Sequence, residues 1–245
     1  MKKFAALLIA AIVTFSLSTS AFAASVASNG KIICIDPGHQ AKANTAPEPI
    51  APGSAITKAK VAAGTHGAWS GLTEAQLNLQ VSLKLQSVLT ARGYTVIMTR
   101  TSDDVNISNA ERAQIANNAK ADAFIRIHAN GVNSSAVSGV LALAPSTANP
   151  YCAGIAPASQ LLSSCIVNGQ TAATGQKNKG VSQSDTMSGI NWSQVPVSIL
   201  ELGFMTNPTE DLNMANGDYQ TLMATGIANG IDQYFASLAA GTAAN

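Results

Sequence analysis

The sequence predicts a single α/β domain built on a mostly parallel sheet that helices cover on both faces. Short apolar runs alternate along the chain with longer segments of helical periodicity, a pattern typical of parallel sheets. The chain has 245 residues, of which 47% are hydrophobic and 11% charged. That length suits one well-packed domain, and the composition supplies a sizeable buried core.

The first 23 residues have the pattern of a signal peptide. Lys2 and Lys3 precede an apolar run from Phe4 to Val13, and Ala21-Phe22-Ala23 has the small-x-small spacing that signal peptidase recognises. The run is shorter than the ~20 apolar residues of a membrane span. We therefore expect a secreted protein without stable membrane insertion, although a retained N-terminal anchor is the alternative.

The first half of the mature chain predicts three strands and two helices. After a polar lead-in (24–30), an apolar strand over 31–35 stops at Pro37-Gly38. Residues 40–70 have no clear periodicity and are expected to form a long loop. A helix should start at Thr73, since Gln76 completes a capping box, and end at Arg92-Gly93. The remaining elements are a strand over 94–98, a helix over 108–119 and a strand over 121–128.

The second half predicts two more strands and two more helices. Strands are expected over 139–144 and 197–201, and helices over 150–168 and 216–238. Residues 171–193 are polar and Gly-rich and are expected to be mostly loop. The domain should thus span 31–238, with a tail over 239–245.

Cysteines and charge exclude two classes of site. Cys34 lies in an apolar run and should be a buried thiol, whereas Cys152 and Cys165 flank the 150–168 helix, which leaves a disulfide between them open. No CxxC spacing occurs, which argues against a thiolate zinc site. The net charge of +1 gives no basic stripe, so a nucleic-acid partner is not expected.

Four residues with metal-binding or acid/base side chains fall at the same predicted edge of the sheet. His39 follows the first strand, His128 ends the third, and Glu201 ends the strand over 197–201. Glu74 lies in the first turn of the helix that begins at Thr73. Because sites in open parallel sheets form at the carboxyl ends of strands, these side chains should converge.

Two imidazoles and one carboxylate are a known ligand set for catalytic zinc, which keeps a fourth position open. A second carboxylate outside the metal shell can act as general acid and base. Each residue also has a structural explanation: Glu74 suits the helix dipole and Glu201 suits a buried ion pair. His66, the third histidine, is expected on the loop but is an alternative to Glu74 as third ligand.

Six ordered segments sharpen this interpretation: IICIDPGHQ (32–40), GLTEAQLNLQVSLKL (71–85), RGYTVIMTR (92–100), ERAQIAN (111–117), ADAFIRIHAN (121–130) and PVSILELGFMTNPTED (196–211). Together they resemble the zinc-dependent N-acetylmuramoyl-L-alanine amidase family of the Amidase_3 type. The resemblance covers nearly the whole mature chain. The combination of DPGH, HAN and ELGF in this order is specific, whereas any one of them alone is weak.

The resemblance implies a twisted sheet of about six strands and a zinc enzyme, and we expect the chain to be a monomer. Its zinc ligands correspond to His39, Glu74 and His128, and its catalytic glutamate corresponds to Glu201. The implied substrate is peptidoglycan, cut between the lactyl group of N-acetylmuramic acid and L-alanine of the stem peptide. The chain would act outside the cell, at the cell wall.

Two departures from the family pattern stand out. Arg126 occupies a position that is often serine, and it needs an anion: a carboxylate near the zinc is favoured over a carboxylate of the stem peptide. Residues 40–70 are longer than in the simplest members and either line the groove or cover it. They contain no strongly amphipathic helix, so we expect an open groove.

Two other functions remain as alternatives. A catalytically silent peptidoglycan-binding module would fit the same fold but would not use all four site residues. A glycosidase acting through Glu74 and Glu201 would leave both histidines idle. A glycosidase would survive a metal chelator, whereas a zinc amidase would not.

Overall fold

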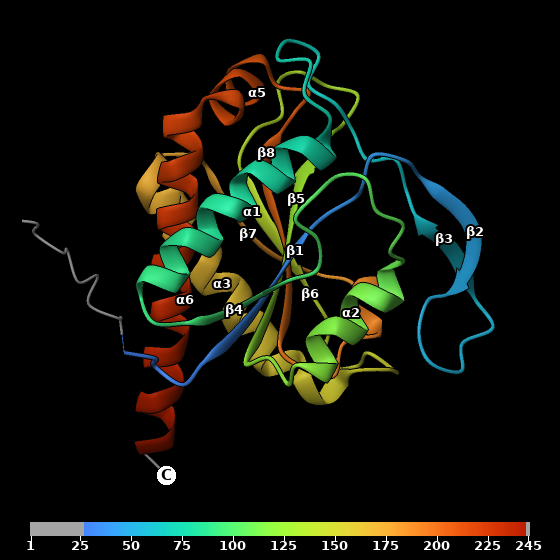
Figure 1. Cartoon of the computed structure of the whole chain (residues 1–245), viewed down its shortest axis with the longest axis vertical. Helices are drawn as coiled ribbons and strands as arrows, with labels where there is room; N and C mark the ends of the chain where they lie inside the picture. The colour runs from blue at the N-terminus through green and yellow to red at the C-terminus, as the bar shows by residue number, and fades with distance from the viewer. Residues whose placement is uncertain (1–26, 244–245) are drawn as a thin grey trace, which may run out of the picture.

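The computed structural model describes residues 27–243, so the expected signal peptide lies outside the described residues. Its centre is a six-stranded sheet in the order β4-β1-β5-β8-β6-β7 (Figure 1). Four neighbouring strands are parallel, and β6 runs antiparallel to β8 with β7 parallel to β6. The strands are β1 (Ile32–Pro37), β4 (Thr95–Met98), β5 (Ala123–Asn130), β6 (Val140–Ala144), β7 (Asn178–Gln183) and β8 (Val197–Phe204). The predicted α/β class and mostly parallel sheet are confirmed.

Helices cover both faces of this sheet. One face packs against α1 (Glu74–Ala91), α3 (Ala156–Thr174) and α6 (Gly217–Ala243). The other packs against α2 (Asn109–Asn118) and the short α4 (Ser188–Asn191). A 3₁₀ turn, η1 (Ala153–Ile155), precedes α3, and α5 (Pro208–Ala215) links β8 to α6.

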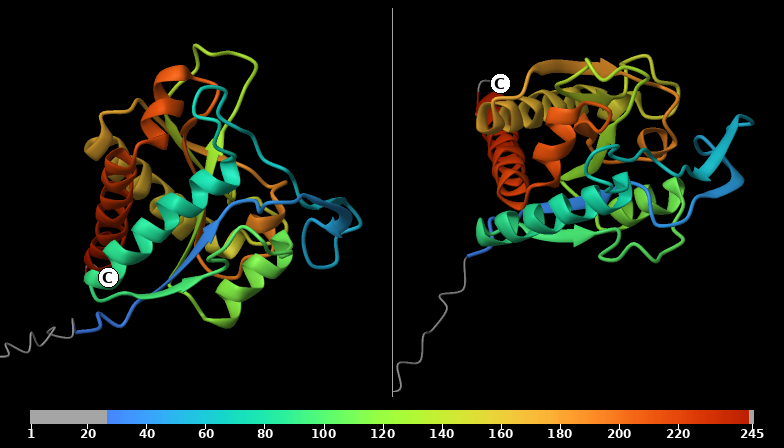
Figure 2. Two further views of the ribbon diagram at one scale, coloured as in Figure 1. Left: turned by 45° about the horizontal axis from the view of Figure 1, so that its top comes forward. Right: turned by 90° about the horizontal axis from the view of Figure 1, so that it is seen from above.

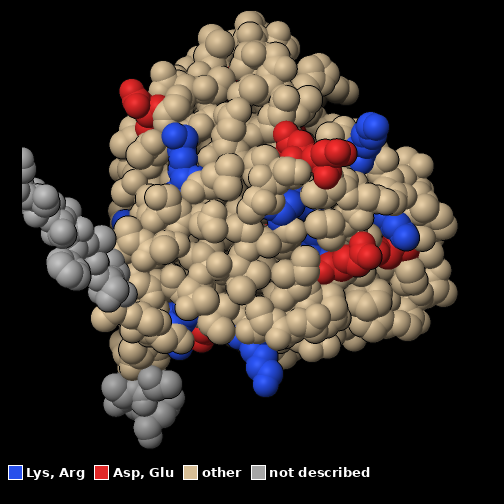
Figure 3. Space-filling model, in the orientation of Figure 1, with Lys and Arg blue, Asp and Glu red and all other residues tan. Residues whose placement is uncertain are grey.

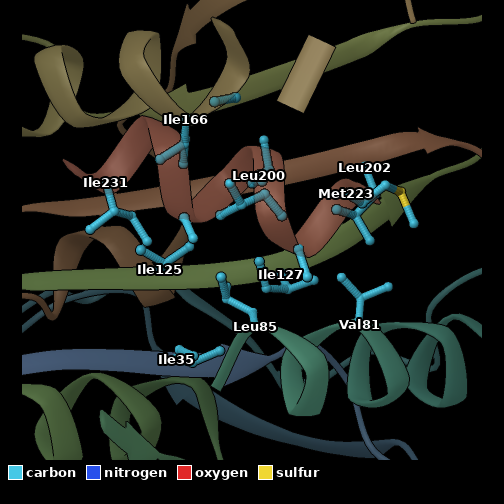
Figure 4. Close-up of a cluster of buried hydrophobic side chains, with 14 of the residues drawn as sticks. Ile35, Val81, Leu85, Ile125, Ile127, Ile166, Leu200, Leu202, Met223 and Ile231 are labelled. Atoms are coloured by element: carbon cyan, nitrogen blue, oxygen red, sulfur yellow. The ribbon is translucent and has the colours of Figure 1, made fainter. Parts of the chain in front are cut away.

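The main core lies between the sheet and the face that carries α1, α3 and α6. Alternate residues of the strands point into it, as the period of two in a strand requires. Figure 4 shows the side chains from strands and helices meeting there, among them Ile35, Val81, Leu85, Ile125, Ile127, Ile166, Leu200, Leu202, Met223 and Ile231. The intervening strand residues, such as Cys34, Phe124 and Ile199, belong to the second core on the α2 side.

The start of α1 follows the predicted capping box. The Thr73 hydroxyl accepts a hydrogen bond from the Gln76 backbone at 3.3 Å, and the Gln76 side chain accepts one from the Thr73 backbone at 3.0 Å. The helix stops where Gly93 adopts φ +84°, a conformation that favours glycine. This cap fixes where Glu74, the first residue of α1, enters the structure.

Several predicted elements differ from the structure. The 40–70 segment contains a hairpin of β2 (Asn44–Pro49) and β3 (Thr57–Val61), and β7 lies in the segment expected to be mostly loop. These strands escaped prediction because most of their residues are exposed, so they carry no apolar alternation. The hairpin projects from the body of the molecule on the side away from α6 (Figure 2).

Helix limits also shift. The expected 150–168 helix begins at Ala156 instead and runs to Thr174, where Gly175 ends it at φ +72°. The last helix continues to Ala243, beyond the expected end at 238. The additional helix α5 begins at an Asn207 cap followed by Pro208.

The three cysteines are free thiols and all are buried. The suggested pairing of Cys152 with Cys165 is wrong, because Cys165 lies within α3 in the main core and Cys152 lies in the second core. Burial raises the pKa of Cys34 and, to about 11, that of Cys152.

Uncharged side chains cover most of the molecular face in Figure 3, and the charged residues form a few small spots on it, several of which combine acidic and basic groups. Within residues 27–243, no helix is both long and apolar enough to cross a membrane.

Candidate active site

The candidate site forms where β1, β5 and β8 meet the beginning of α1. Arg126 and His128 point from β5 to the same side of the sheet, since they are two residues apart. On the adjacent β8, Glu201 is the register partner of His128. The prediction that Glu201 ends its strand is wrong: β8 continues to Phe204, because Leu202 and Phe204 are also buried. A bulge follows this pair, with one extra residue on β8.

Three of the four predicted residues come together around one oxygen atom. Nε2 of His39 lies 3.1 Å from Oε1 of Glu74, and Nδ1 of His128 lies 3.1 Å from the same oxygen. All three potential ligand atoms lie within 4.8 Å of one another. His66 is exposed and forms an isolated bridge with Thr73, so it is not part of this cluster.

The loop between β3 and α1 holds His39 and Glu74 in place. Nδ1 of His39 is 2.8 Å from the carbonyl oxygen of Ala62, which can only accept, so this nitrogen carries the proton and Nε2 presents its lone pair to the cluster. Oε2 of Glu74 accepts a hydrogen bond from the backbone N–H of Thr65 at 2.9 Å. On its other oxygen, Oε1, it accepts the N–H of Ala129 at 3.1 Å.

Backbone geometry at the site is specialised. His39 adopts φ +56°, which is uncommon outside glycine and typical of functional positions. A Cβ at Gly38 would lie 2.3 Å from Cε1 of His128, and one at Gly64 would lie 2.9 Å from Oε2 of Glu74. Both glycines are therefore required by close backbone approach to the cluster.

Electrostatics prepare these groups as ligands. Burial alone would raise the pKa of Glu74, but its interactions with the imidazoles of His128 and His39 outweigh burial and hold that pKa well below its usual range. Burial lowers the pKa of His128 to about 4, although Glu74 opposes the shift. At neutral pH the cluster therefore contains an ionised carboxylate and a neutral His128, the forms that bind a metal.

The three residues fit a zinc ion. A tetrahedral ion with bonds of about 2.0–2.1 Å separates its ligands by roughly 3.3 Å, close to the two 3.1 Å contacts of Glu74 Oε1. Nε2 of His128 is buried with no hydrogen-bond partner among the described residues. This ring is therefore not fixed by a structural hydrogen bond through that nitrogen, and its Nδ1 faces the cluster.

Glu201 lines a pocket of about 450 Å³ together with His39 and His128. Burial, and secondly the charge of Glu74, raise the pKa of Glu201 to about 8, while Arg126 opposes the shift. The carboxyl group of Glu201 therefore holds a proton at neutral pH, and a cation bound in the neighbouring cluster would lower its pKa. The environment of Glu201 thus raises its pKa, whereas the environment of Glu74 lowers the pKa of that residue.

The β2–β3 hairpin forms one wall of this pocket. Lys58, Ala59, Val61 and Ala62 line it, facing Leu143, Ile199 and the α4 residues Ser188 and Gly189. No helix forms within residues 40–70. Of the two roles considered for this segment, the structure therefore supports lining the groove.

An ion-pair network beside the pocket involves residues that the sequence did not identify. Nε of Arg126 donates to Oδ2 of Asp36 at 2.8 Å, and Nη1 of Arg112 donates to Oδ1 at 2.8 Å. The favoured prediction, that Arg126 pairs with a nearby carboxylate, is confirmed. Burial would raise the pKa of Asp36, but the two guanidinium groups and the Thr99 hydroxyl outweigh it and hold it well below its usual range.

Residues 33–233 match the Amidase_3 family, described as N-acetylmuramoyl-L-alanine amidase. The chain belongs to this family. The crystal structure of the amidase Ami1 from Mycobacterium smegmatis superposes with a TM-score of 0.77 at 26% identity, covering 87% of this chain and 99% of that one. An N-acetylmuramoyl-L-alanine amidase from Clostridium difficile superposes with a TM-score of 0.70 at 27% identity, covering 86% and 99%.

Sequence relatives agree with this assignment to the amidase family. The amidase Rv3717 of Mycobacterium tuberculosis is 28% identical over 239 residues, which is 94% of this chain and 96% of that protein. YqiI of Bacillus subtilis is 32% identical over 166 residues, which is 68% of this chain and 76% of that protein. Family membership and Rv3717, which is named as an N-acetylmuramoyl-L-alanine amidase, support the activity of a peptidoglycan amidase.

Proposed function

We propose that the chain is a secreted, zinc-dependent N-acetylmuramoyl-L-alanine amidase that cleaves the amide bond between N-acetylmuramic acid and L-alanine of the stem peptide. One observation carries this proposal. The His39–Glu74–His128 cluster opens onto the pocket that Glu201 enters from the neighbouring strand.

His39, Glu74 and His128 would hold the zinc ion through Nε2, Oε1 and Nδ1. When bound, such an ion supplies Lewis-acid polarisation of a carbonyl and lowers the pKa of water. The protein residues set its charge: one carboxylate and two imidazoles leave the site positive. The Ala62 carbonyl and the Thr65 and Ala129 amides keep the ligands oriented.

Glu201 would move the proton in this reaction. A cation in the neighbouring cluster would lower the pKa of Glu201, so that its carboxylate would accept a proton from the attacking water and the resulting acid would donate it to the departing amino group of L-alanine. The register pairing with His128 places Glu201 one strand spacing, about 4.8 Å, from the strand that carries a zinc ligand. The raised pKa of Glu201 favours the second step, because the protonated acid is accessible near neutral pH.

The proposed substrate and location follow from the relatives and from the N-terminal pattern. The staphylococcal relatives named LytH are described as probable cell wall amidases, and they are 27–28% identical to this chain. Together with the signal-peptide pattern of residues 1–23, they support action on peptidoglycan outside the cell. We expect the enzyme to act as a monomer.

Digestion of purified cell wall tests the proposal. The mature protein is incubated with wall, and the fragments are analysed by mass spectrometry with and without a chelator, while bound metal is measured by elemental analysis. We expect one zinc per chain and stem peptides with a free L-alanine amino group, both lost on chelation and restored by zinc. Zinc binding without release of peptides would instead indicate a silent binding module, and new reducing ends that survive chelation would indicate a glycosidase.

A further inference from the structure

The buried network beside the pocket contains more positive than negative charge. Asp36 is fully buried and is shared between two arginines, Arg112 and Arg126. All three nitrogens of the Arg112 guanidinium donate hydrogen bonds. Nε donates to the carbonyl oxygen of Ile107, Nη1 to Asp36 and the carbonyl oxygen of Pro37, and Nη2 to the carbonyl oxygen of His39 and to Oε1 of Gln40. One carboxylate therefore serves two guanidinium groups, and Arg112 has no capacity left.

Arg126 is the member of this network that reaches the pocket. Its Nε donates to Oδ2 of Asp36, and its Nη2 donates to Oδ1 of Asn109 at 2.7 Å. Its Nη1 has no hydrogen-bond partner within residues 27–243. Arg126 lines the pocket together with Glu201, yet no hydrogen bond joins these two side chains in the described part of the chain.

Gly189 leaves the room that this guanidinium occupies. A Cβ at position 189 would lie 1.7 Å from Nη1 of Arg126 and 2.3 Å from its Cζ. Arg126 is also fixed by Asp36 and Asn109 and is only 3% exposed. The guanidinium is thus a rigid, largely desolvated cation with one free amino group, which favours an anion as partner.

Resting on the proposed function, we infer that Arg126 binds a carboxylate of the stem peptide and makes the enzyme selective for stems that carry it. Lys58, on the opposite hairpin wall, adds a second positive charge to the pocket. The remaining lining is mostly apolar, with Val61, Leu143 and Ile199, and offers no competing anion other than Glu201. The free Nη1 group of Arg126 can donate charge-assisted hydrogen bonds to a carboxylate, and these are stronger than hydrogen bonds to the oxygen of a neutral carboxamide.

The spacing of residues along β5 indicates which carboxylate of the stem peptide Arg126 binds. Arg126 lies two residues before His128 on the same side of the strand, which is about 7 Å along the chain. An extended peptide covers about 3.5 Å per residue, so the carboxylate belongs to the second residue after the scissile bond.

Two synthetic muropeptides that differ only in this group, free carboxylate or carboxamide, provide the test. With the zinc-loaded full-length mature protein, we expect kcat/KM to be at least about tenfold higher for the carboxylate form, mainly through KM. Equilibrium binding of both ligands is measured by calorimetry, and we expect the same order. Equal binding and equal kcat/KM would overturn the inference.

Variants then assign the selectivity to Arg126. Arg126→Met should abolish the preference, so that the ratio of kcat/KM for the carboxylate and carboxamide substrates falls to about one. Gly189→Ala retains the charge but displaces the guanidinium, and it should reduce the preference as well. Lys84→Met, which removes a positive charge from α1 outside the pocket, should retain the full preference. A preference that persists in Arg126→Met would contradict the assignment.

These outcomes are separable from failure of the amidase proposal. If neither muropeptide is cleaved, the proposed reaction is wrong, yet the calorimetric comparison still reports whether the pocket prefers the carboxylate. If Arg126→Met fails to fold because Asp36 loses a partner, the parent protein and Gly189→Ala still decide the question.

Discussion

At the scale of single residues, two glutamates of one site are held in opposite protonation states by their surroundings. Glu74 accepts backbone N–H groups and faces two imidazoles, which favours the carboxylate. Burial and the negative charge of Glu74 both disfavour the ionised form of Glu201, which favours the protonated acid. Such a divergence commonly separates a ligand or base from a proton donor.

Glu201→Gln should remove proton transfer while leaving the zinc site intact. Glutamine has nearly the same shape but cannot accept a proton from water. We expect turnover to fall by about 10²–10⁴-fold, measured as release of L-alanine amino groups from cell wall. The zinc content should be unchanged by elemental analysis. Near-normal turnover would show that another group handles the proton.

Asp36→Asn should destabilise the fold in a pH-dependent manner. Because the pKa of Asp36 is lowered in the folded protein, its carboxylate stabilises the fold fully above the unfolded pKa near 3.9, and this contribution is lost progressively as pH falls from there towards the lower folded pKa. At pH 7 we expect a loss of about 3–5 kcal/mol in the free energy of unfolding, since two guanidinium groups lose their buried partner.

Urea unfolding of both proteins at pH 7 and at acid pH measures this difference, and the gap should shrink below about pH 4. Asp218→Asn, at an exposed position in the first turn of α6, is the control and should have little effect. A gap that stays constant with pH would argue against the ionised carboxylate as its cause.

At the scale of elements, α3 and α6 pack through glycines. A Cβ at Gly169 would lie 2.3 Å from the carbonyl oxygen of Gly226, and one at Gly230 would lie 2.5 Å from that of Cys165. The two helix backbones therefore approach each other more closely than larger side chains allow. This contact supports the core beneath β8, the strand that carries Glu201.

Gly230→Ala should destabilise the protein, although alanine is the better helix former by about 1 kcal/mol at an open position. The new methyl group meets backbone atoms that cannot move aside separately, and overpacking costs about 1–3 kcal/mol. Gly217→Ala, where nothing lies within 4 Å of the added Cβ, should be neutral or slightly stabilising. Thermal unfolding of both variants checks the contrast, and a more stable Gly230→Ala would refute the close packing.

At the scale of the whole molecule, the metal cluster joins segments that are distant in the chain. His39 follows β1, Glu74 begins α1 and His128 lies in β5, so a bound ion would tie the sheet to the helix that covers it. Binding to the folded state alone adds stability that grows with the metal concentration.

Zinc should therefore raise the unfolding temperature of chelator-treated protein. At 100 times the dissociation constant the gain is about 2.7 kcal/mol, which corresponds to about 5–10 °C for a domain of this size. His66→Ala should show the same shift because His66 lies outside the cluster, whereas His39→Ala should show little. A full shift in His39→Ala would remove this residue from the metal shell.

Sequence and structure agree best where local chemistry is strong. The capping box at Thr73 and Gln76 predicted the first residue of α1, and the period of two over 121–128 predicted the two faces of β5. The hairpin and β7 were missed because exposed strands lack that period. The Asp36–Arg112–Arg126 network was missed because ion pairs between residues 76 and 90 positions apart leave no local signal.

The sequence by itself determined the α/β class, the positions of the main strands along the chain and the family, because these depend on periodicity and on motifs read along the chain. Only the tertiary structure decided that His39, Glu74 and His128 share one oxygen-centred cluster while His66 stays outside. It also decided which guanidinium faces the pocket. Distances between segments and the burial of charge arise when the chain packs, and no spacing in the sequence encodes them.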